Sequence, residues 1–335
     1  MPFVSIVVPT RNEEEFIDKC LESLINQNFP KDKYEILVID GESEDRTVEI
    51  ASRFPVKIIT ERKLAPAHNA GIRNSNGEIV AFFDSNANAD PNWLRFLIEN
   101  FDDSKVGCVI GGQECLFGDN LVSRIRKAYH ARGDLLSSKT FIREPHPTTW
   151  KAVTTFASAF SRNVLIEIGG ADESIDCIDK ELGILIEKLK YMIIKDRRAK
   201  VYHNLDDSLI AYLKKIERYN KVDGILFRRY GVYKEKVPLA AVTFNYIILL
   251  ISLLLSTIVF NLSSDYLIIT LLPLLGGLIY YFGKGAQLKL LNKENFTTYI
   301  AFPFLSLVFI FLRNIGFIRG IISRNIQRDC PFRSR

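Results

Sequence analysis

Residues 79–86 read IVAFFDSN, five apolar residues followed by an aspartate, a serine and an asparagine. An uninterrupted apolar run of this length that ends in polar residues is typical of a strand buried on both faces of a parallel sheet. Similar runs begin at Phe3, Ile36 and Val56, and segments with helical spacing of apolar residues separate them. The first 110 residues therefore predict an α/β fold, a mostly parallel sheet with flanking helices.

Polar residues follow three of the predicted strands, at 9–13, 40–45 and 84–88. In open sheets of this kind, ligands bind at the carboxyl ends of the strands. Asp84 and Asn86 can offer oxygen ligands to Mg²⁺, which commonly takes one or two protein ligands and completes its shell with water and phosphate oxygens. An Asx turn that closes the strand is the alternative interpretation of this triplet. Asp40, which ends another strand of the same sheet, favours the ligand site.

Three apolar runs, 239–264, 266–283 and 296–312, follow residue 238. The first has 26 positions without a formal charge, which at about 1.5 Å per residue exceeds the ~30 Å hydrocarbon core of a bilayer. Together the first two runs predict a helical transmembrane hairpin, and the basic residues around it place both ends on the cytoplasmic side. The third run contains Pro303 and is followed by basic residues that include Arg313, Arg319, Arg324 and Arg328. A transmembrane span and a re-entrant or interfacial segment both remain open for it.

The segment 195–236 is rich in Lys and Arg and directly precedes the apolar runs. Such a segment is attracted to anionic headgroups, whereas binding of single-stranded nucleic acid would require interleaved base-stacking aromatic residues. We therefore expect the lipid bilayer, and no nucleic acid, as a partner. The five cysteines include no CxxC pair, and the N-terminus has no secretory signal. The first part of the chain is accordingly expected in the reducing cytoplasm.

Four motifs share the order and spacing of one enzyme family: VSIVVPTRNEE (4–14), YEILVIDGESEDRT (34–47), AHNAGIRNSNGEIVAFFDSNA (67–87), and IGGADES (168–174) with IDKEL (178–182). Over about residues 2–205 the chain resembles the inverting family 2 glycosyltransferases, which have a GT-A fold. Residues 199–231 and the apolar runs behind them resemble, more narrowly, membrane-bound members that build bacterial exopolysaccharides and archaeal lipid-linked glycans. We expect a GT-A catalytic domain at 1–205, a basic amphipathic juxtamembrane segment at 206–237, and a multi-pass membrane anchor of two or three hydrophobic helices at 238–335.

The resemblance implies roles for the residues that match the family's motifs. Contacts with the nucleotide sugar are implied for Thr10, Glu13, Asp40, Asn69 and Asp84. A divalent cation, Mg²⁺ or Mn²⁺, is implied at Asp84 and Asn86, with His203 as a further candidate ligand, and Asp179 is the implied general base. For His203 a purely structural role stays open, and for Asp179 a helix-start role does.

The chain departs from the family pattern mildly at Gly41, which follows Asp40 where a second aspartate is frequent, and more strongly at two other positions. Asn86 stands where a second metal-binding aspartate is common, and Ile178 stands where a glutamate usually precedes the base. The departure at Asn86 puts the affinity for the metal in question. Together, Asn86 and Ile178 also allow a function other than catalysis: a non-catalytic membrane scaffold that retains the fold.

The implied reaction moves a sugar, with inversion, from a nucleotide-sugar donor to a hydroxyl of a lipid-linked saccharide at the cytoplasmic membrane face. In such a reaction a metal stabilises the leaving diphosphate and a base takes the proton of the attacking hydroxyl. A polyprenyl phosphate, as used by dolichyl-phosphate sugar synthases, is the alternative acceptor. A phosphate is already ionised and needs no base, so the presence of Asp179 favours the hydroxyl.

Overall fold

The computed structural model describes residues 1–62, 64–116, 123, 141–142, 153–175, 178–204, 208–232, 308 and 311–323. The chain forms two compact units. The first consists chiefly of Met1–Leu116 and Leu135–Leu205, and the second of Phe117–Asp134 and Asp206–Gln327. All the strands described below belong to the first unit.

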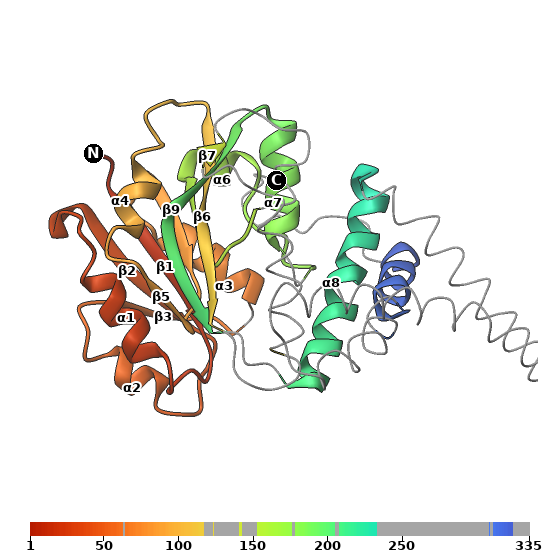
Figure 1. Cartoon of the computed structure of the whole chain (residues 1–335), viewed down its shortest axis with the longest axis horizontal. Helices are drawn as coiled ribbons and strands as arrows, with labels where there is room; N and C mark the ends of the chain where they lie inside the picture. The colour runs from red at the N-terminus through yellow and green to blue at the C-terminus, as the bar shows by residue number, and fades with distance from the viewer. Residues whose placement is uncertain are drawn as a thin grey trace, which may run out of the picture. The chain divides into compact units, whose positions relative to one another are not determined.

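Nine strands of the described residues form one sheet (Figure 1). They follow the order β3-β2-β1-β4-β8-β6-β9-β5, and β7 pairs with β9. Their bounds are β1 (Val4–Thr10), β2 (Tyr34–Asp40), β3 (Lys57–Thr60), β4 (Ile79–Phe83), β5 (Ala87–Ala89), β6 (Val106–Leu116), β7 (Phe141–Ile142), β8 (Ala157–Ser161) and β9 (Met192–Asn204). The first four strands pair in parallel, as predicted.

The sheet as a whole is mixed, which corrects the prediction of a mostly parallel one. Strand β8 runs antiparallel to both of its neighbours, β4 and β6. Strand β9 runs parallel to β6 but antiparallel to β5 and β7. A short apolar run indicates a strand but not its direction, because the direction is set by partners far along the chain.

Helices cover both faces of the sheet. They are α1 (Ile17–Ile25), α2 (Thr47–Ala51), α3 (Leu64–Asn74), α4 (Trp93–Ile98), α6 (Arg162–Glu167) and α7 (Ile178–Lys188), with a 3₁₀ turn at Lys31–Lys33. Ile6 and Val8 of β1 lie in a core cluster with residues of α1 and α4. Val7, whose side chain points to the other face, meets Gly71 of α3. Both faces of β1 are thus buried, which explains its apolar run without polar alternation.

In the second unit, α8 (Leu209–Tyr230) packs along the helical residues 311–321 through three glycines. Gly316 faces the carbonyl of Glu217, Gly320 that of Lys221, and Gly224 that of Phe317. A Cβ atom at any of the three would overlap the facing backbone, so the two helices approach at backbone distance. From the pair Glu217–Gly316 to the pair Lys221–Gly320 both residue numbers rise by four, and the helices therefore run parallel.

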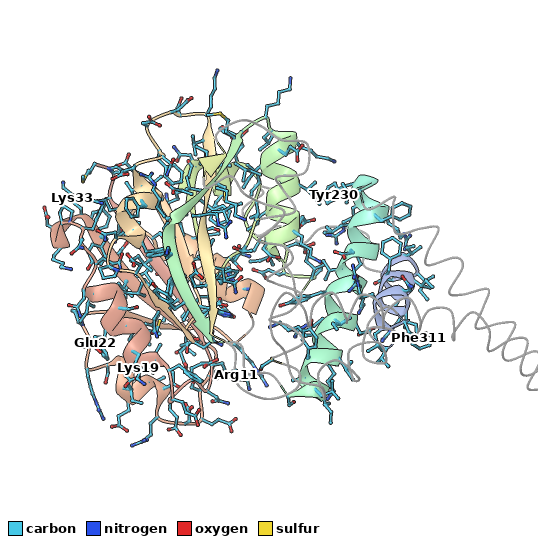
Figure 2. The ribbon with its side chains drawn as sticks, in the orientation of Figure 1. Arg11, Lys19, Glu22, Lys33, Tyr230 and Phe311 are labelled. Atoms are coloured by element: carbon cyan, nitrogen blue, oxygen red, sulfur yellow. The ribbon has the colours of Figure 1, made fainter. Side chains whose placement is uncertain are left out.

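Polar contacts join the same two helices. Arg319 Nη1 donates to Glu217 Oε1 at 2.6 Å, and Arg228 Nη1 donates to the carbonyls of Ile321 (2.6 Å) and Ser323 (2.7 Å). Arg228 thereby donates to two carbonyls near the end of the described part of the second helix, where helical carbonyls commonly need partners from outside the helix. In Figure 2, Tyr230 marks the end of α8 and Phe311 the start of the second helix.

The predicted transmembrane runs 239–264 and 266–283 lie outside the described residues, as does most of 296–312. Among the residues that the structure does describe, no helix is both long and apolar enough to cross a bilayer.

Gly71 provides a test of the sheet packing. Alanine normally favours a helix interior over glycine by about 1 kcal/mol, but here a Cβ atom would lie 2.9 Å from Val7 Cγ2 and 3.2 Å from Val7 Cβ. We expect Gly71→Ala to destabilise the protein by about 1–3 kcal/mol through overpacking, measured as a lower thermal unfolding temperature. Adding Val7→Ala to Gly71→Ala should restore part of the lost stability, because it removes the Val7 methyl groups that the new Cβ atom would overlap. A more stable Gly71→Ala protein would contradict this packing.

Candidate active site

A cleft of about 400 Å³ opens at the carboxyl ends of β1, β2 and β4. Its lining brings together four predicted site residues from two separate loops: Thr10, Glu13, Asp84 and Asn86. The rest of the lining is Pro9, Arg11, Ile39, Gly41, Glu61, Arg62, Ala67 and Ser85. Parallel neighbours deliver their carboxyl ends to one edge of the sheet, and this places the loops side by side.

The loops after β1 and β2 are joined by reciprocal hydrogen bonds. The Asn12 N–H donates to Ser43 Oγ at 3.0 Å, and Asn12 Oδ1 accepts from the Glu44 N–H at 2.9 Å. The Glu13 N–H donates to Thr47 Oγ1 at 2.7 Å. Asn12 has a φ of 54°, in the left-handed region that asparagine tolerates better than most residues. These bonds fix the backbone that carries Glu13 into the cleft.

Asp40, predicted to hold the base or ribose, ends β2 but is only 4% exposed. Its carboxylate accepts hydrogen bonds from the Ser43 hydroxyl (2.6 Å) and the Ser43 N–H (3.2 Å). The cleft is lined by its neighbours Ile39 and Gly41 and not by Asp40 itself. Asp40 therefore shapes the loop after β2, and its contact with a nucleotide stays a prediction.

Asp84 contacts His203 across 119 residues of sequence, with 3.1 Å between Asp84 Oδ2 and His203 Nε2. The strand register explains the contact, because Ala87 of β5 pairs with His203 of β9, and the turn from Asp84 to Ala87 joins β4 to β5. The ring of His203 also lies against Phe156, with 5.3 Å between centroids. His203 Nδ1 is buried and has no hydrogen-bond partner among the described residues.

The side chains around Asp84 fit a divalent cation. Asp84 and Asn86 line the cleft and offer a carboxylate and an amide oxygen, ligands that suit Mg²⁺ and Mn²⁺. Within the described ranges no group of three or more His, Cys, Asp and Glu side chains could hold a metal. The chain thus supplies a partial ligand set, the kind that phosphate oxygens and water complete.

Glu13 lies in an unfavourable place for a negative charge. Burial raises the pKa of Glu13 from 4.5 to about 7, and the nearby charge of Asp84 adds to the shift. Near neutral pH the side chain therefore exchanges between its neutral and ionised forms. A positive charge at the mouth of the cleft would lower this pKa again.

Besides Asp40 and His203, two further predicted site residues, Asn69 and Asp179, are not among those that line the cleft. Asn69 is fully buried on α3, and its amide bonds to residues 171 and 173. Asp179 lies in the first turn of α7, where its Oδ1 accepts from the Lys180 N–H at 2.8 Å. Their contacts with donor or acceptor stay predictions.

Two arginine side chains line the cleft that were not predicted as site residues from the sequence. Arg11, labelled in Figure 2, follows β1, and Arg62 follows β3; both line the cleft. Arg62 Nε lies 3.5 Å from Glu42 Oε2 in an exposed ion pair. Guanidinium groups suit the oxygens of a diphosphate. The signal that could have revealed them was their position directly after predicted strands.

A sheet that carries a polar cleft and a partial cation site at its carboxyl edge defines an α/β protein of the nucleotide-binding kind. The family is more specific. Residues 5–169 match the family described as glycosyl transferase family 2. The chain therefore carries a family 2 glycosyltransferase domain, and it is a glycosyltransferase.

Similar proteins agree with this assignment. A dolichyl N-acetyl-alpha-D-glucosaminyl phosphate 3-beta-D-2,3-diacetamido-2,3-dideoxy-beta-D-glucuronosyltransferase of Methanococcus voltae is 27% identical over 97% of this chain and 99% of its own length. Glycosyltransferase AglE of Haloferax volcanii is 38% identical, over 34% of this chain and 40% of its own. The solved mannosyltransferase PcManGT of Pyrobaculum calidifontis shares the fold, with a TM-score of 0.60 at 19% identity over 93% of this chain and 86% of that one. The fold is thus GT-A-like.

Glu13 predicts a pH dependence of stability. Its pKa is raised in the folded state, so the unfolded chain releases this proton at lower pH, and folding is progressively penalised from about pH 4.5 to about pH 7. In buffer without divalent cations, the unfolding temperature of the wild type should fall over this interval more than that of Glu13→Gln. Glu22→Gln, an exposed change on α1 (Figure 2), is the matched control. Parallel curves for Glu13→Gln and wild type would contradict the burial of this carboxylate.

Proposed function

We propose that this glycosyltransferase moves a sugar, with inversion, from a nucleotide-sugar donor to a hydroxyl of a lipid-linked saccharide at the cytoplasmic face of the membrane. The observation that carries the proposal is the position of Asp84, which directly follows β4, lines the cleft and contacts His203. The similar mannosyltransferase from Pyrobaculum calidifontis was solved with GDP-Man and Mn²⁺. That complex supports the same class of donor here.

Different residues of the cleft have different proposed roles in binding the donor. Asp84 and Asn86 are the proposed ligands of Mg²⁺ or Mn²⁺, with His203 next to them. Bound there, the cation would neutralise charge that develops on the leaving diphosphate. Arg11 adds a second positive charge on the cleft wall. Because Asn86 is neutral where relatives commonly have a carboxylate, we expect weaker cation binding than two aspartates would give.

Asp179 is the proposed base. It is half-buried in the first turn of α7, and a carboxylate can accept the proton of an attacking hydroxyl. The same position suits a carboxylate that only stabilises the start of the helix. Removing this carboxylate would lower the stability of the protein in either role. Only the rate of sugar transfer therefore separates the two roles.

The acceptor is proposed from the relatives and from the apolar runs. The protein from Methanococcus voltae aligns with almost the whole of this chain, and its name describes transfer to a dolichyl-linked amino sugar. The rival acceptor, a polyprenyl phosphate, would need no general base. The two acceptors thus predict different effects of a change at Asp179.

Turnover by the full chain in detergent tests the site. Donors are UDP- and GDP-sugars with Mn²⁺, and the acceptor is the lipid-linked saccharide extracted from membranes. We expect Asp84→Ala to lose metal-dependent transfer, and Asp179→Asn to lower kcat by about 10²–10⁴-fold as a missing general base does. Asp18→Asn, an exposed aspartate on α1, is the control.

Three results would change the account. Full transfer by both site variants would refute the site. Full transfer by Asp179→Asn alone would refute Asp179 as the base, and transfer of the same sugar to added polyprenyl phosphate would then favour a phosphate acceptor. No transfer by the wild type with any donor would favour the scaffold alternative.

We propose that residues 206–237 lie at the membrane surface and that the apolar runs of 238–335 anchor the chain as a multi-pass protein. The surface of α8 supports this, because Ile210 is 67% exposed and Lys214 and Lys215 follow one turn later. On the packed partner helix Ile322 is 72% exposed, beside basic residues such as Arg319. Apolar side chains flanked by lysine and arginine are typical of interfacial helices.

The contact between α8 and residues 311–321 supports a constraint on the anchor. The two helices touch through their glycines, and within the described residues neither α8 nor 311–321 is long and apolar enough to span a bilayer. We propose that both helices lie on the same side of the membrane, in agreement with the predicted hairpin of 239–264 and 266–283. For 296–312, a transmembrane span and a re-entrant or interfacial segment both stay open as predictions.

Cysteine labelling tests this constraint. In a protein whose five native cysteines are replaced by serine, Ile210→Cys and Ile322→Cys should react with a membrane-impermeant maleimide from the same side of sealed vesicles. Lys19→Cys on α1, an exposed position, reports the side of the catalytic domain. Labelling of Ile210→Cys and Ile322→Cys from opposite sides would require an odd number of crossings and would refute the helix contact.

A further inference from the structure

Asn69 uses its whole amide group to hold a loop 102 residues away. Its Oδ1 accepts from the Ala171 N–H at 2.8 Å, and its Nδ2 donates to the Ala171 carbonyl at 3.0 Å. The second Nδ2 hydrogen goes to Glu173 Oε1 at 2.8 Å. Asn69 is 0% exposed. Both donors of the amide are therefore committed within the protein, which leaves none for a nucleotide.

The loop that Asn69 holds is fixed at its other end as well. Helix α6 ends in a Schellman motif, in which Gly170 N–H donates to the Leu165 carbonyl and Gly169 N–H to the Ile166 carbonyl. Both glycines have positive φ, 83° and 75°, which side chains other than glycine rarely adopt. Directly behind this turn, Asn69 pairs with both backbone groups of Ala171. The path of residues 169–173 is thus set on both sides.

The position of Asn69 links the two halves of the proposed reaction. Two residues before it on α3, Ala67 lines the donor cleft. The loop that it holds, through Glu173, leads towards α7, whose first turn carries Asp179. A buried side chain with three hydrogen bonds is a stiff connection, because each bond that is lost would leave a buried polar group without a partner.

We infer that Asn69 is a positioning residue, which sets the loop 171–173 ahead of α7 and so holds the base of α7 in register with the donor cleft. This role rests on the proposed function of Asp179, and it replaces the predicted contact of Asn69 with the nucleotide sugar. Asn69 acts through Ala171 and Glu173 and touches neither substrate.

Kinetics of the full chain test the inference. Asn69→Asp has nearly the same shape but cannot donate to Ala171 or Glu173, and it places two carboxylates against each other. We expect an unchanged KM for the donor and a kcat lower by about 10–100-fold, the loss that follows a displacement of about 1 Å in an active site. Adding Glu173→Gln restores a donor across the 2.8 Å contact and should recover part of kcat.

The matched control is Asn74→Asp on the same helix, where Asn74 Nδ2 donates to the Ala70 carbonyl of α3 and Asn74 Oδ1 accepts from exposed Lys57 Nζ at 3.4 Å. It should leave kcat unchanged. Hydrogen exchange of the backbone gives a readout that does not need activity: Asn69→Asp should speed exchange at residues 171–175, and Asn74→Asp should not.

Three outcomes are distinguishable. Faster exchange with normal kcat in Asn69→Asp would overturn the positioning role while the proposed function stands. A raised donor KM with normal kcat would overturn it in favour of a direct donor contact. If Asn69→Asp speeds exchange at residues 171–175 but the wild type itself transfers no sugar, the proposed function is refuted, and with it the effect of Asn69 on catalysis. The hydrogen bonds of Asn69 to Ala171 and Glu173 would still stand.

Discussion

The contact between Asp84 and His203 is the constraint on which the site depends. Asp84 ends a central parallel strand, and the turn behind it sends the chain into β5, whose three residues pair with the end of β9. That pairing brings His203 within 3.1 Å of the Asp84 carboxylate. The contact thereby fixes the orientation of the Asp84 carboxylate, which is 44% exposed, at the edge of the cleft. The same pairing makes β5 the strand at one edge of the sheet.

The first half of the fold could be predicted from the sequence because its signals are local. The apolar runs of β1, β2 and β4 are buried on both faces, and polar residues directly behind these strands fall at the cleft. The second half could not, because β8 and β9 take their directions and partners from strands far along the chain. The motif match located Asp84 and His203, but only the β5–β9 register explains why they meet.

Two predicted site residues illustrate why a motif does not reveal a contact. Asp40 and Asn69 stand at the expected positions, yet the hydrogen bonds of the first go to its own loop and those of the second to residues 171 and 173. Such partners depend on how loops fold over each other, which spacing does not encode. Arg11 was missed for the converse reason: it stands inside the first motif, but the resemblance implied roles only for Thr10 and Glu13 there, although Arg11 also lines the cleft. The glycine contacts of the second unit likewise join segments about 90 residues apart.

The account requires that a divalent cation bind beside Asp84 when a nucleotide occupies the cleft. A crystal of the protein grown with Mn²⁺ and a nucleoside diphosphate, measured at the manganese absorption edge, tests this directly. The account predicts one anomalous peak within coordination distance of the Asp84 carboxylate, shared with a phosphate oxygen. Nucleotide bound in the cleft with no peak at Asp84, or with the manganese held by other side chains, would contradict it.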